Sequence, residues 1–338
     1  MKKILNVALG AFLATSWVTQ SYGYGYDLLD YAGVYVIGDY TEPSNNGLSV
    51  GDLPTASPVA NGFDGGRRAL FLDPRFRWDY TVGITFDLCC QNQLFFQYDY
   101  YNYNQSREDD GTISIGLPFP PTNNSAPLGR VRERENDFIL GLAHWINFGP
   151  HFAVNVSAYA EYERLTRHLF EESDQTVNGV LFTNTRFTDN KLRAYGPGIG
   201  ILGRAYPGDD HHWSFFAGIM TTLFYAKNHY EQLFLSDGDF GYDYEPEDSH
   251  SVIAKININA GVDYCFEISK RRSILMDIAV GVRYLNIFNA FKNGDTAFNP
   301  LVQGHPNVGT KSGFAANTGF AEDWGRWGPY IQLSVGGW

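Results

Sequence analysis

The feature that most constrains this chain is an alternation of apolar and polar residues that continues for more than a dozen positions. From Val252 to Phe266 every second residue is apolar, and from Lys255 onward the residues between them are Lys, Asn, Gly, Asp or Cys. Because a β-strand directs successive side chains to opposite faces, this segment predicts a strand with one apolar face. Strands of soluble proteins usually have about 5–6 residues, whereas a tilted membrane crossing needs about 9–11. The length therefore favours a strand that crosses a membrane.

The same pattern recurs along the chain, with clear examples between Arg75 and Leu88 and between Met276 and Tyr284. No internal segment approaches the ~18 consecutive apolar residues of a spanning helix. Charged residues make up 18% of the chain, below the roughly 25% of globular domains, and aromatic residues make up 16%. Without helices, a chain crosses lipid only as a closed barrel, in which every backbone polar group is paired. The sequence predicts an all-β fold, a transmembrane antiparallel up-and-down β-barrel.

Counting the alternating segments predicts about ten strands, and a range of eight to twelve is compatible with the pattern. Ten is an even number, which places both termini on the periplasmic side. The ten predicted spans are Tyr31–Tyr40, Pro74–Leu88, Gln93–Asn104, Arg134–Asn147, Phe152–Arg167, Lys191–Tyr206, Trp213–Asn228, Ser251–Ile268, Ile274–Asn289 and Trp327–Trp338.

The connections between these spans alternate in length, as they do in outer-membrane barrels with short periplasmic turns and long outer loops. The predicted short turns are Cys89–Asn92, Phe148–His151, Pro207–His212 and Ser269–Ser273. The predicted long outer segments are Thr41–Leu72, Gln105–Glu133, His168–Asn190, Tyr230–His250 and Ala290–Arg326.

The N-terminus has the pattern of a secretory signal peptide. Lys2 and Lys3 precede a mostly apolar stretch, Ile4–Val18, and Ser21-Tyr22-Gly23 places small residues around a cleavage site. We expect a signal peptide at 1–23 and a barrel at 24–338. Removing the two lysines takes the net charge from −12 to −14, which argues against nucleic acid as a partner.

The C-terminal segment alternates and ends in an aromatic residue, which resembles the signal recognised by the barrel assembly machinery. Leu333 and Val335 are out of phase with Trp338, and a bulge at Gly336-Gly337 would reset the register. We expect the assembly signal to comprise Tyr330, Leu333, Val335 and Trp338.

Several short motifs in the predicted strands carry a resemblance to a known family. They are Arg77-Trp78-Asp79-Tyr80, Tyr195-Gly196-Pro197-Gly198-Ile199-Gly200, Arg204-Ala205-Tyr206, Phe216-Ala217-Gly218 and Ala260-Gly261-Val262-Asp263-Tyr264. With these, the chain resembles the Legionella-type major outer membrane protein family over most of its mature length. The resemblance implies an abundant outer-membrane barrel with porin or surface-structural roles, and it brings no catalytic motif.

Charged residues on the polar faces of the predicted strands form the first candidate site. Opposite charges in a narrow lumen are expected to pair, because isolated buried charges are costly. A barrel near eight strands is just filled by side chains, whereas 16–18 strands leave an open channel, so about ten strands predict a plugged or very narrow conduit. The residues expected to face the lumen are Arg75, Arg77, Asp79, Asp99, Glu161, Glu163, Lys255, Asp263, Asp277 and Arg283.

Two acidic clusters are further candidates. An acidic outer loop is expected to be solvated, with weak cation binding as the alternative; it contains Asp237, Asp239, Asp243, Glu245, Glu247 and Asp248. The second cluster, Asp209-Asp210-His211-His212, has residue types that bind metals or act in outer-membrane proteases. It falls in a predicted periplasmic turn, so a solvated turn is the favoured interpretation.

The three cysteines, Cys89, Cys90 and Cys265, fit no metal-site spacing, and their odd number leaves one free or paired between chains. We expect no catalytic residue, no bound metal and no cofactor. The expected partners are outer-membrane lipid, lipopolysaccharide and the barrel assembly machinery, with a homo-oligomer possible. The expected function is porin-like diffusion of small solutes or a structural role at the surface of the outer membrane. An adhesin or receptor that acts through the outer loops, and an outer-membrane hydrolase, stay open as alternatives.

Overall fold

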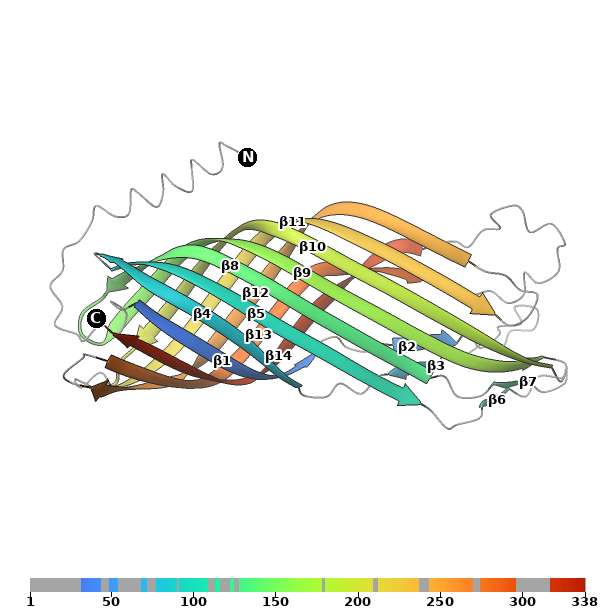
Figure 1. Ribbon diagram of the computed structural model, residues 1–338, viewed down its shortest axis with the longest axis horizontal. Helices are drawn as coiled ribbons and strands as arrows, with labels where there is room; N and C mark the ends of the chain where they lie inside the picture. The colour runs from blue at the N-terminus through green and yellow to red at the C-terminus, as the bar shows by residue number, and fades with distance from the viewer. Residues whose placement is uncertain are drawn as a thin grey trace.

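The computed structural model describes residues 32–43, 49–53, 68–71, 77–89, 91–108, 113–115, 122–124, 128–177, 180–208, 212–236, 243–269, 274–295 and 317–337. The predicted signal peptide lies outside them. Ten long strands form the wall of one barrel (Figure 1): β1 Ala32–Pro43, β4 Arg77–Cys89, β5 Asn92–Glu108, β8 Leu128–Asn147, β9 Phe152–Val177, β10 Val180–Ala205, β11 Trp213–Ser236, β12 Asp243–Ser269, β13 Ile274–Asp295 and β14 Asn317–Gly337.

The barrel is closed and antiparallel throughout, because each of the ten strands pairs with its two sequence neighbours and β1 also pairs with β14. The predicted fold class and the predicted number of strands are therefore confirmed. Four short strands accompany the wall: β2 Ser49–Leu53 pairs with β3 Arg68–Phe71, and β6 Ile113–Ile115 pairs with β7 Thr122–Asn124.

The strand ends that border the four predicted short turns all lie at one end of the barrel, which we call the turn end, together with the start of β1 and the end of β14 (Figure 1). The opposite end is called the loop end. Short turns and chain termini mark the periplasmic side of an outer-membrane barrel, so the loop end corresponds to the outer side.

The strands continue much further at the loop end than the sequence predicted. β9 and β10 have 26 residues each and pair without interruption up to Val177 and Val180. The prediction that His168–Asn190 forms a long loop is therefore wrong, and most of Tyr230–His250 is also strand. The physical reason is that an antiparallel ladder continues wherever backbone groups pair, with or without an apolar face.

The outer wall of the barrel exposes apolar side chains, as a lipid-facing surface does. Ile199, for example, is 63% exposed and Leu223 is 61% exposed. Towards the loop end this apolar surface is bounded by aromatic residues that lie opposite one another on adjacent strands, which we call the outer aromatic row: Tyr40, Trp78, Phe138, Tyr162, Tyr195, Tyr225, Tyr284 and Trp327. Aromatic girdles of this kind mark the membrane interface.

In the described part of the chain, no helix has the length and hydropathy to cross a membrane.

The last strand places the described residues of the expected assembly signal on two faces. Leu333 and Val335 are exposed on the outer wall, whereas Tyr330 is buried on the opposite face. β14 pairs with β1 from Trp327 to Gly337 and with β13 over the same residues, and neither ladder shifts its register at Gly336. The predicted bulge is therefore absent from the described strand. Trp338 lies outside the described residues.

Candidate functional site: the barrel interior

The inward side chains of the barrel form three successive levels between the turn end and the loop end. The first is a polar pocket, the second a network of buried charges, and the third a cluster of buried apolar side chains that we call the apolar plug. Each level is built from alternate residues of the wall strands, because only every second side chain of a strand points inward. The level that a residue joins is therefore set by its position along the strand.

Lys255 of β12 is the centre of the charged network. Its ammonium Nζ lies 2.7 Å from Asp137 Oδ2, 2.8 Å from Glu161 Oε1, 2.7 Å from Glu163 Oε2 and 3.6 Å from Glu135 Oε1. The four acids come from β8 and β9, on strands that do not neighbour β12 in the sheet. The lysine therefore reaches across the lumen and ties opposite walls of the barrel together.

Two arginines extend the network to the strands near the closure. Arg283 on β13 donates from Nη2 to Asp99 Oδ2 at 2.6 Å and from Nη1 to Asp39 Oδ2 at 3.1 Å. Arg326 on β14 has Nη1 3.3 Å from Asp79 Oδ2 and Nη2 3.1 Å from Glu135 Oε2. These guanidinium groups also connect strands across the lumen, since β5 and β8 are not adjacent to β13 or β14.

Hydroxyl groups complete the coordination of several carboxylates. Thr41 donates to Asp79, and Thr222 donates to Glu161. Arg283 additionally donates to Thr81 Oγ1 at 3.1 Å. Because a buried carboxylate is costly unless it is paired and hydrogen-bonded, these donors contribute to keeping the network buried.

The carboxylates of Glu135, Asp137 and Glu163 present oxygens within 4.8 Å of one another, an arrangement that could ligate a metal ion. Lys255 contacts all three of these acids. The Lys255 ammonium group thus supplies positive charge to the carboxylates that a metal cation would bind. A metal site is not required to explain this cluster.

The apolar plug lies on the loop-end side of the charged network. Every wall strand contributes an inward side chain that is at most 4% exposed at or beside this level: Thr41, Asp79, Tyr101, Glu133, Leu165, Leu192, Phe224, Ile253, Leu285 and Trp324. A water-filled path through the barrel would have to expose some of these residues. The described side chains therefore close the lumen against water.

The plug is joined to charged residues at its centre. Arg167 Nε lies 2.6 Å from Glu133 Oε1, and its guanidinium carbon lies 4.1 Å from the centroid of the Phe291 ring. Trp324 donates from Nε1 to Glu133 Oε2 at 3.1 Å. This buried acid thus has two donors, and the aromatic rings are fixed by polar contacts as well as by packing.

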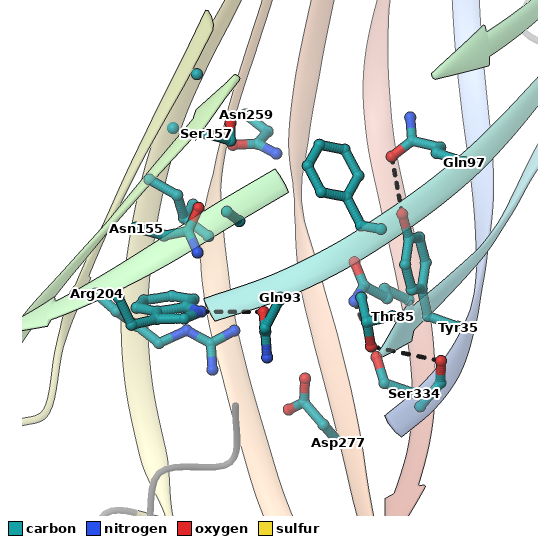
Figure 2. A pocket seen from close by; sticks show the side chains of 18 of the residues that line it. Tyr35, Thr85, Gln93, Gln97, Asn155, Ser157, Arg204, Asn259, Asp277 and Ser334 are labelled. Carbon is teal, nitrogen blue, oxygen red and sulfur yellow. Dashed lines mark hydrogen bonds between the residues drawn. The ribbon is translucent and has the colours of Figure 1, made fainter. Parts of the chain in front are cut away.

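The polar pocket occupies the turn-end part of the lumen and has a volume of about 280 Å³. Figure 2 shows Tyr35, Gln97, Asn155, Ser157, Arg204 and Asp277 among its lining side chains. Tyr35 donates to Gln97 Oε1 at 2.9 Å, and Trp145 donates to Gln93 Oε1 at 3.2 Å. The polar lining residues are mainly amides and hydroxyls, and they alternate with aromatic, aliphatic and glycine residues.

Arg204 is the cationic group of the pocket, and it is already paired. Its Nη2 lies 2.9 Å from Asp263 Oδ2. Ser214 donates a hydrogen bond to the same carboxylate, at Oδ1. Arg204 of β10 therefore forms a further ion pair between strands, with Asp263 of β12.

The structure places the residues expected to face the lumen as follows. Buried inside the barrel are Asp79, Asp99, Glu161, Glu163, Lys255, Asp263 and Arg283, and Asp277 lines the pocket. Arg77 differs: its side chain is exposed and donates from Nη2 to the Asn104 carbonyl at 3.2 Å, because it lies at the loop end of β4 above the buried levels. Arg75 lies outside the described residues.

Sequence reasoning missed about half of the charged interior. The missed residues are Asp39, Glu133, Glu135, Asp137, Arg167, Arg204 and Arg326. Glu133 and Arg326 fall in segments that were predicted to be loops. The signal that identifies the three acids of β8 is the alternation of inward and outward positions. Glu133, Glu135 and Asp137 alternate with Arg134, Asn136 and the outward Phe138.

The predicted acidic loop is partly strand. Asp243, Glu245, Glu247 and Asp248 lie in β12 and pair with β11, whereas Asp237 and Asp239 lie outside the described residues. Asp248 is exposed on the outer wall with Lys227 Nζ at 2.9 Å and His229 Nδ1 at 2.6 Å. These hydrogen bonds from His229 and Lys227 hold the pKa of the Asp248 carboxyl below its ordinary value.

A similar cluster lies on the β9–β10 extension. Lys191 Nζ lies 2.6 Å from Asp189 Oδ2, and His168 Nδ1 lies 3.0 Å from Asp189 Oδ1. His168 is 16 residues beyond the start of β9, past the ~9–11 residues of a crossing, so the cluster lies outside the membrane. Partial burial would raise the pKa of Asp189, but the hydrogen bonds from His168 and Lys191 outweigh it and lower the pKa.

The His229–Asp248 and His168–Asp189 pairs lie toward the loop end, whereas the described residue of the Asp209–His212 cluster lies at the turn end. These described residues therefore do not converge on one hydrolytic site. Asp209, Asp210 and His211 lie outside the described residues, and His212 is exposed at the turn end with its Nδ1 2.9 Å from the Cys265 carbonyl. Cys265 is buried with a free thiol. Cys90 lies outside the described residues, as does the side chain of Cys89.

No protein-family model and no curated protein sequence matches this chain. Solved structures with a similar arrangement include the outer membrane protease OmpT from Escherichia coli, with 10% identity, coverage of 95% of this chain and 98% of that chain, and a TM-score of 0.44. A FadL homologue from Pseudomonas aeruginosa has 8% identity, coverage of 91% and 89%, and a TM-score of 0.28.

The outer-membrane expressed OmpT of Vibrio cholerae has 8% identity, coverage of 91% and 96%, and a TM-score of 0.22. Likeness at this level transfers no activity to this chain. The strand pairing, the apolar outer wall and the aromatic row define it, from its own residues, as an outer-membrane-type β-barrel.

Proposed function

We propose that this chain is a sealed outer-membrane barrel with a structural role at the cell surface, where it anchors a rigid extension of strands and loops beyond the membrane. The observation that carries the proposal is the closed interior, in which all ten strands contribute inward side chains that are at most 4% exposed. A diffusion pore needs a continuous water-filled path, so the porin-like alternative has less support.

The strand extensions support a role at the outer surface. β9, β10, β11 and β12 have 24 to 27 residues each, more than twice the ~9–11 needed to cross the membrane. The added length continues the hydrogen-bonded wall beyond the membrane. The resemblance to the Legionella-type major outer membrane proteins implies porin or surface-structural roles, and the second of these agrees with this proposal.

A liposome-swelling assay tests the sealed interior. The mature chain is refolded into liposomes, its fold is verified by heat-modifiable migration on a gel, and swelling is followed in isotonic solutions of small sugars. We expect swelling no faster than in protein-free liposomes, whereas a 16-stranded porin gives rapid swelling. Permeation of sugars through the folded barrel would overturn the proposal.

The surface position is tested separately on intact cells. An epitope inserted between Val177 and Val180, at the tip of the β9–β10 hairpin, is expected to be labelled by antibody without permeabilisation. An epitope in the turn between Ala205 and Trp213 is the matched control and is expected to be labelled only after permeabilisation. The reverse pattern would contradict the proposed orientation.

A further inference from the structure

A row of basic side chains runs along the outer wall, one step beyond the outer aromatic row. Arg164 follows Tyr162 by two residues on β9, and Arg193 precedes Tyr195 by two residues on β10. Arg164 lies directly opposite Arg193, and Arg193 lies directly opposite Lys227 of β11. All three side chains are exposed. We call these residues, together with Arg134 of β8, the basic row.

Arg134 belongs to the row because its register partner is Thr166, two residues from Arg164. Diagonal neighbours on one face of a sheet lie about 7–8 Å apart, and direct partners about 4.5–5.5 Å apart. The four cationic groups therefore gather on one patch of four adjacent strands, β8 to β11.

The described part of the chain leaves most of this positive charge uncompensated. Lys227 pairs with Asp248 at 2.9 Å. Among the residues that the structure describes, Arg134, Arg164 and Arg193 have no carboxylate partner. Like charges directly opposite each other on adjacent strands are destabilising, so the facing pair Arg164 and Arg193 calls for an anion from outside the chain.

The height of the row on the barrel indicates which anion is available. The aromatic row lies at the membrane interface, and the apolar surface below it includes Leu140, 54% exposed, and Ile199, 63% exposed. Side chains just beyond such a girdle lie at the level of lipid headgroups. Guanidinium groups bind phosphate in a bidentate manner.

We infer that the basic row is a binding site for the phosphorylated headgroup of lipopolysaccharide in the outer leaflet, with Arg164 and Arg193 as its principal ligands. The acyl chains of the same lipid would lie against Tyr162, Tyr195 and the apolar wall below them. The charge of the lipid phosphates offsets the repulsion between the two facing arginines. This inference goes beyond the proposed structural role and does not depend on whether the lumen is sealed.

The test measures lipid binding to the refolded barrel by native mass spectrometry and by titration, with bisphosphorylated lipid A in detergent micelles as the probe. Each basic residue near a membrane surface contributes about 1 kcal/mol, so Arg193→Gln is expected to weaken binding about fivefold and R164Q/R193Q about 30-fold. R164K/R193K keeps the charge but cannot bind phosphate in the bidentate manner, so its affinity is expected to lie between those of the unmodified chain and R164Q/R193Q.

The matched control is Arg77→Gln, which removes an exposed guanidinium on β4 that is not part of the row; it is expected to bind lipid A like the unmodified chain. Lipid A stripped of its phosphates is expected to bind about as weakly as the double variant does. Equal binding by R164Q/R193Q and the unmodified chain would overturn the inference, as would equal binding of phosphorylated and dephosphorylated lipid A. Displacement of lipid A by millimolar inorganic phosphate would also overturn it, because the site would then bind the free anion.

Discussion

Replacing Lys255 with Met should remove the cation that holds opposite walls of the barrel together. The ammonium group is 3% exposed and contacts four carboxylates at 2.7 to 3.6 Å. Methionine has a similar length and no charge, so the change isolates the electrostatic loss. Removing one partner of a buried ion pair costs about 3–5 kcal/mol, because the remaining charge is left buried without compensation.

The expected result for K255M is a fall in the free energy of unfolding of at least about 3 kcal/mol. Asp137, Glu161 and Glu163 contact Lys255, and Glu135 contacts both Lys255 and Arg326. Because several acids lose a cationic contact at once, the expected loss is at or above the cost of a single pair. The assay is urea unfolding of the refolded barrel in detergent, followed by tryptophan fluorescence. The free energy of unfolding is obtained by linear extrapolation.

Two further variants make the measurement interpretable. Lys227→Met removes an exposed lysine, 50% accessible and paired with an equally exposed Asp248, and should leave stability almost unchanged. K255M/E163Q should lose less than the two single variants added together, because the removed charges interact. A loss below about 1 kcal/mol for K255M would refute the reasoning, since the network would then behave like surface ion pairs.

Three other expectations follow from the interior and the extension. Trp324→Ala should lower the free energy of unfolding by about 3–5 kcal/mol, because Trp324 is fully buried and donates to Glu133; urea titration against W327A, on the exposed wall, checks this, and equal losses would contradict it. Gly198→Ala should lower the free energy of unfolding by about 1–3 kcal/mol through overpacking, because the added Cβ would overlap the Tyr159 ring. Gly203→Ala is the control, since its Cβ would lie 3.7 Å from the nearest atom. Similar unfolding midpoints in urea for the two variants would count against this packing. The ion pairs of Asp189 should persist on acidification to the unfolded-state pKa of about 3.9 and be lost only as the pH falls through the folded-state pKa, which is lower. Carbon NMR titration of the Asp189 carboxyl should give a midpoint below about 3.9 that rises in K191M. An unshifted midpoint would show that the contacts do not stabilise the anion.

The membrane-crossing part of the fold could be predicted from the sequence because lipid imposes a strong pattern. Within β12, apolar residues alternate with polar or small ones from Ala254 to Phe266, and the predicted start and end of that span differ from the described strand mainly at the loop end. The turn-end boundaries agree closely for the same reason: an apolar face ends where the lipid ends.

The extensions could not be predicted because no lipid enforces a pattern there. His168–Asn190 contains polar residues on both faces, and its strand structure comes from pairing between β9 and β10. A pairing partner is a property of two segments together, and alternation within either segment does not report it.

The presence of paired charges in the interior could be predicted from the sequence, but only some of the residues that form the pairs could be. Lys255 and Arg283 stand out because each is a charged residue on the polar face of a strand whose alternation is clear. Asp39 and Arg326 lie near the ends of short or poorly bounded predicted spans, so their inward direction depended on boundaries that were not known. Which acid meets which base depends on the closure of the barrel, and Arg283 meets Asp39 only because β1 pairs with β14.

The central claim is that the interior of this barrel is closed to ions and water. Single-channel recording of the refolded mature chain in a planar bilayer, with a heat-modifiability gel to verify the fold, tests it most directly. We expect the folded barrel to insert and stay electrically silent, because the charged network and the apolar plug occupy the whole cross-section. Steady, reproducible conductance steps from folded protein would contradict it and would make a small-solute pore the working function.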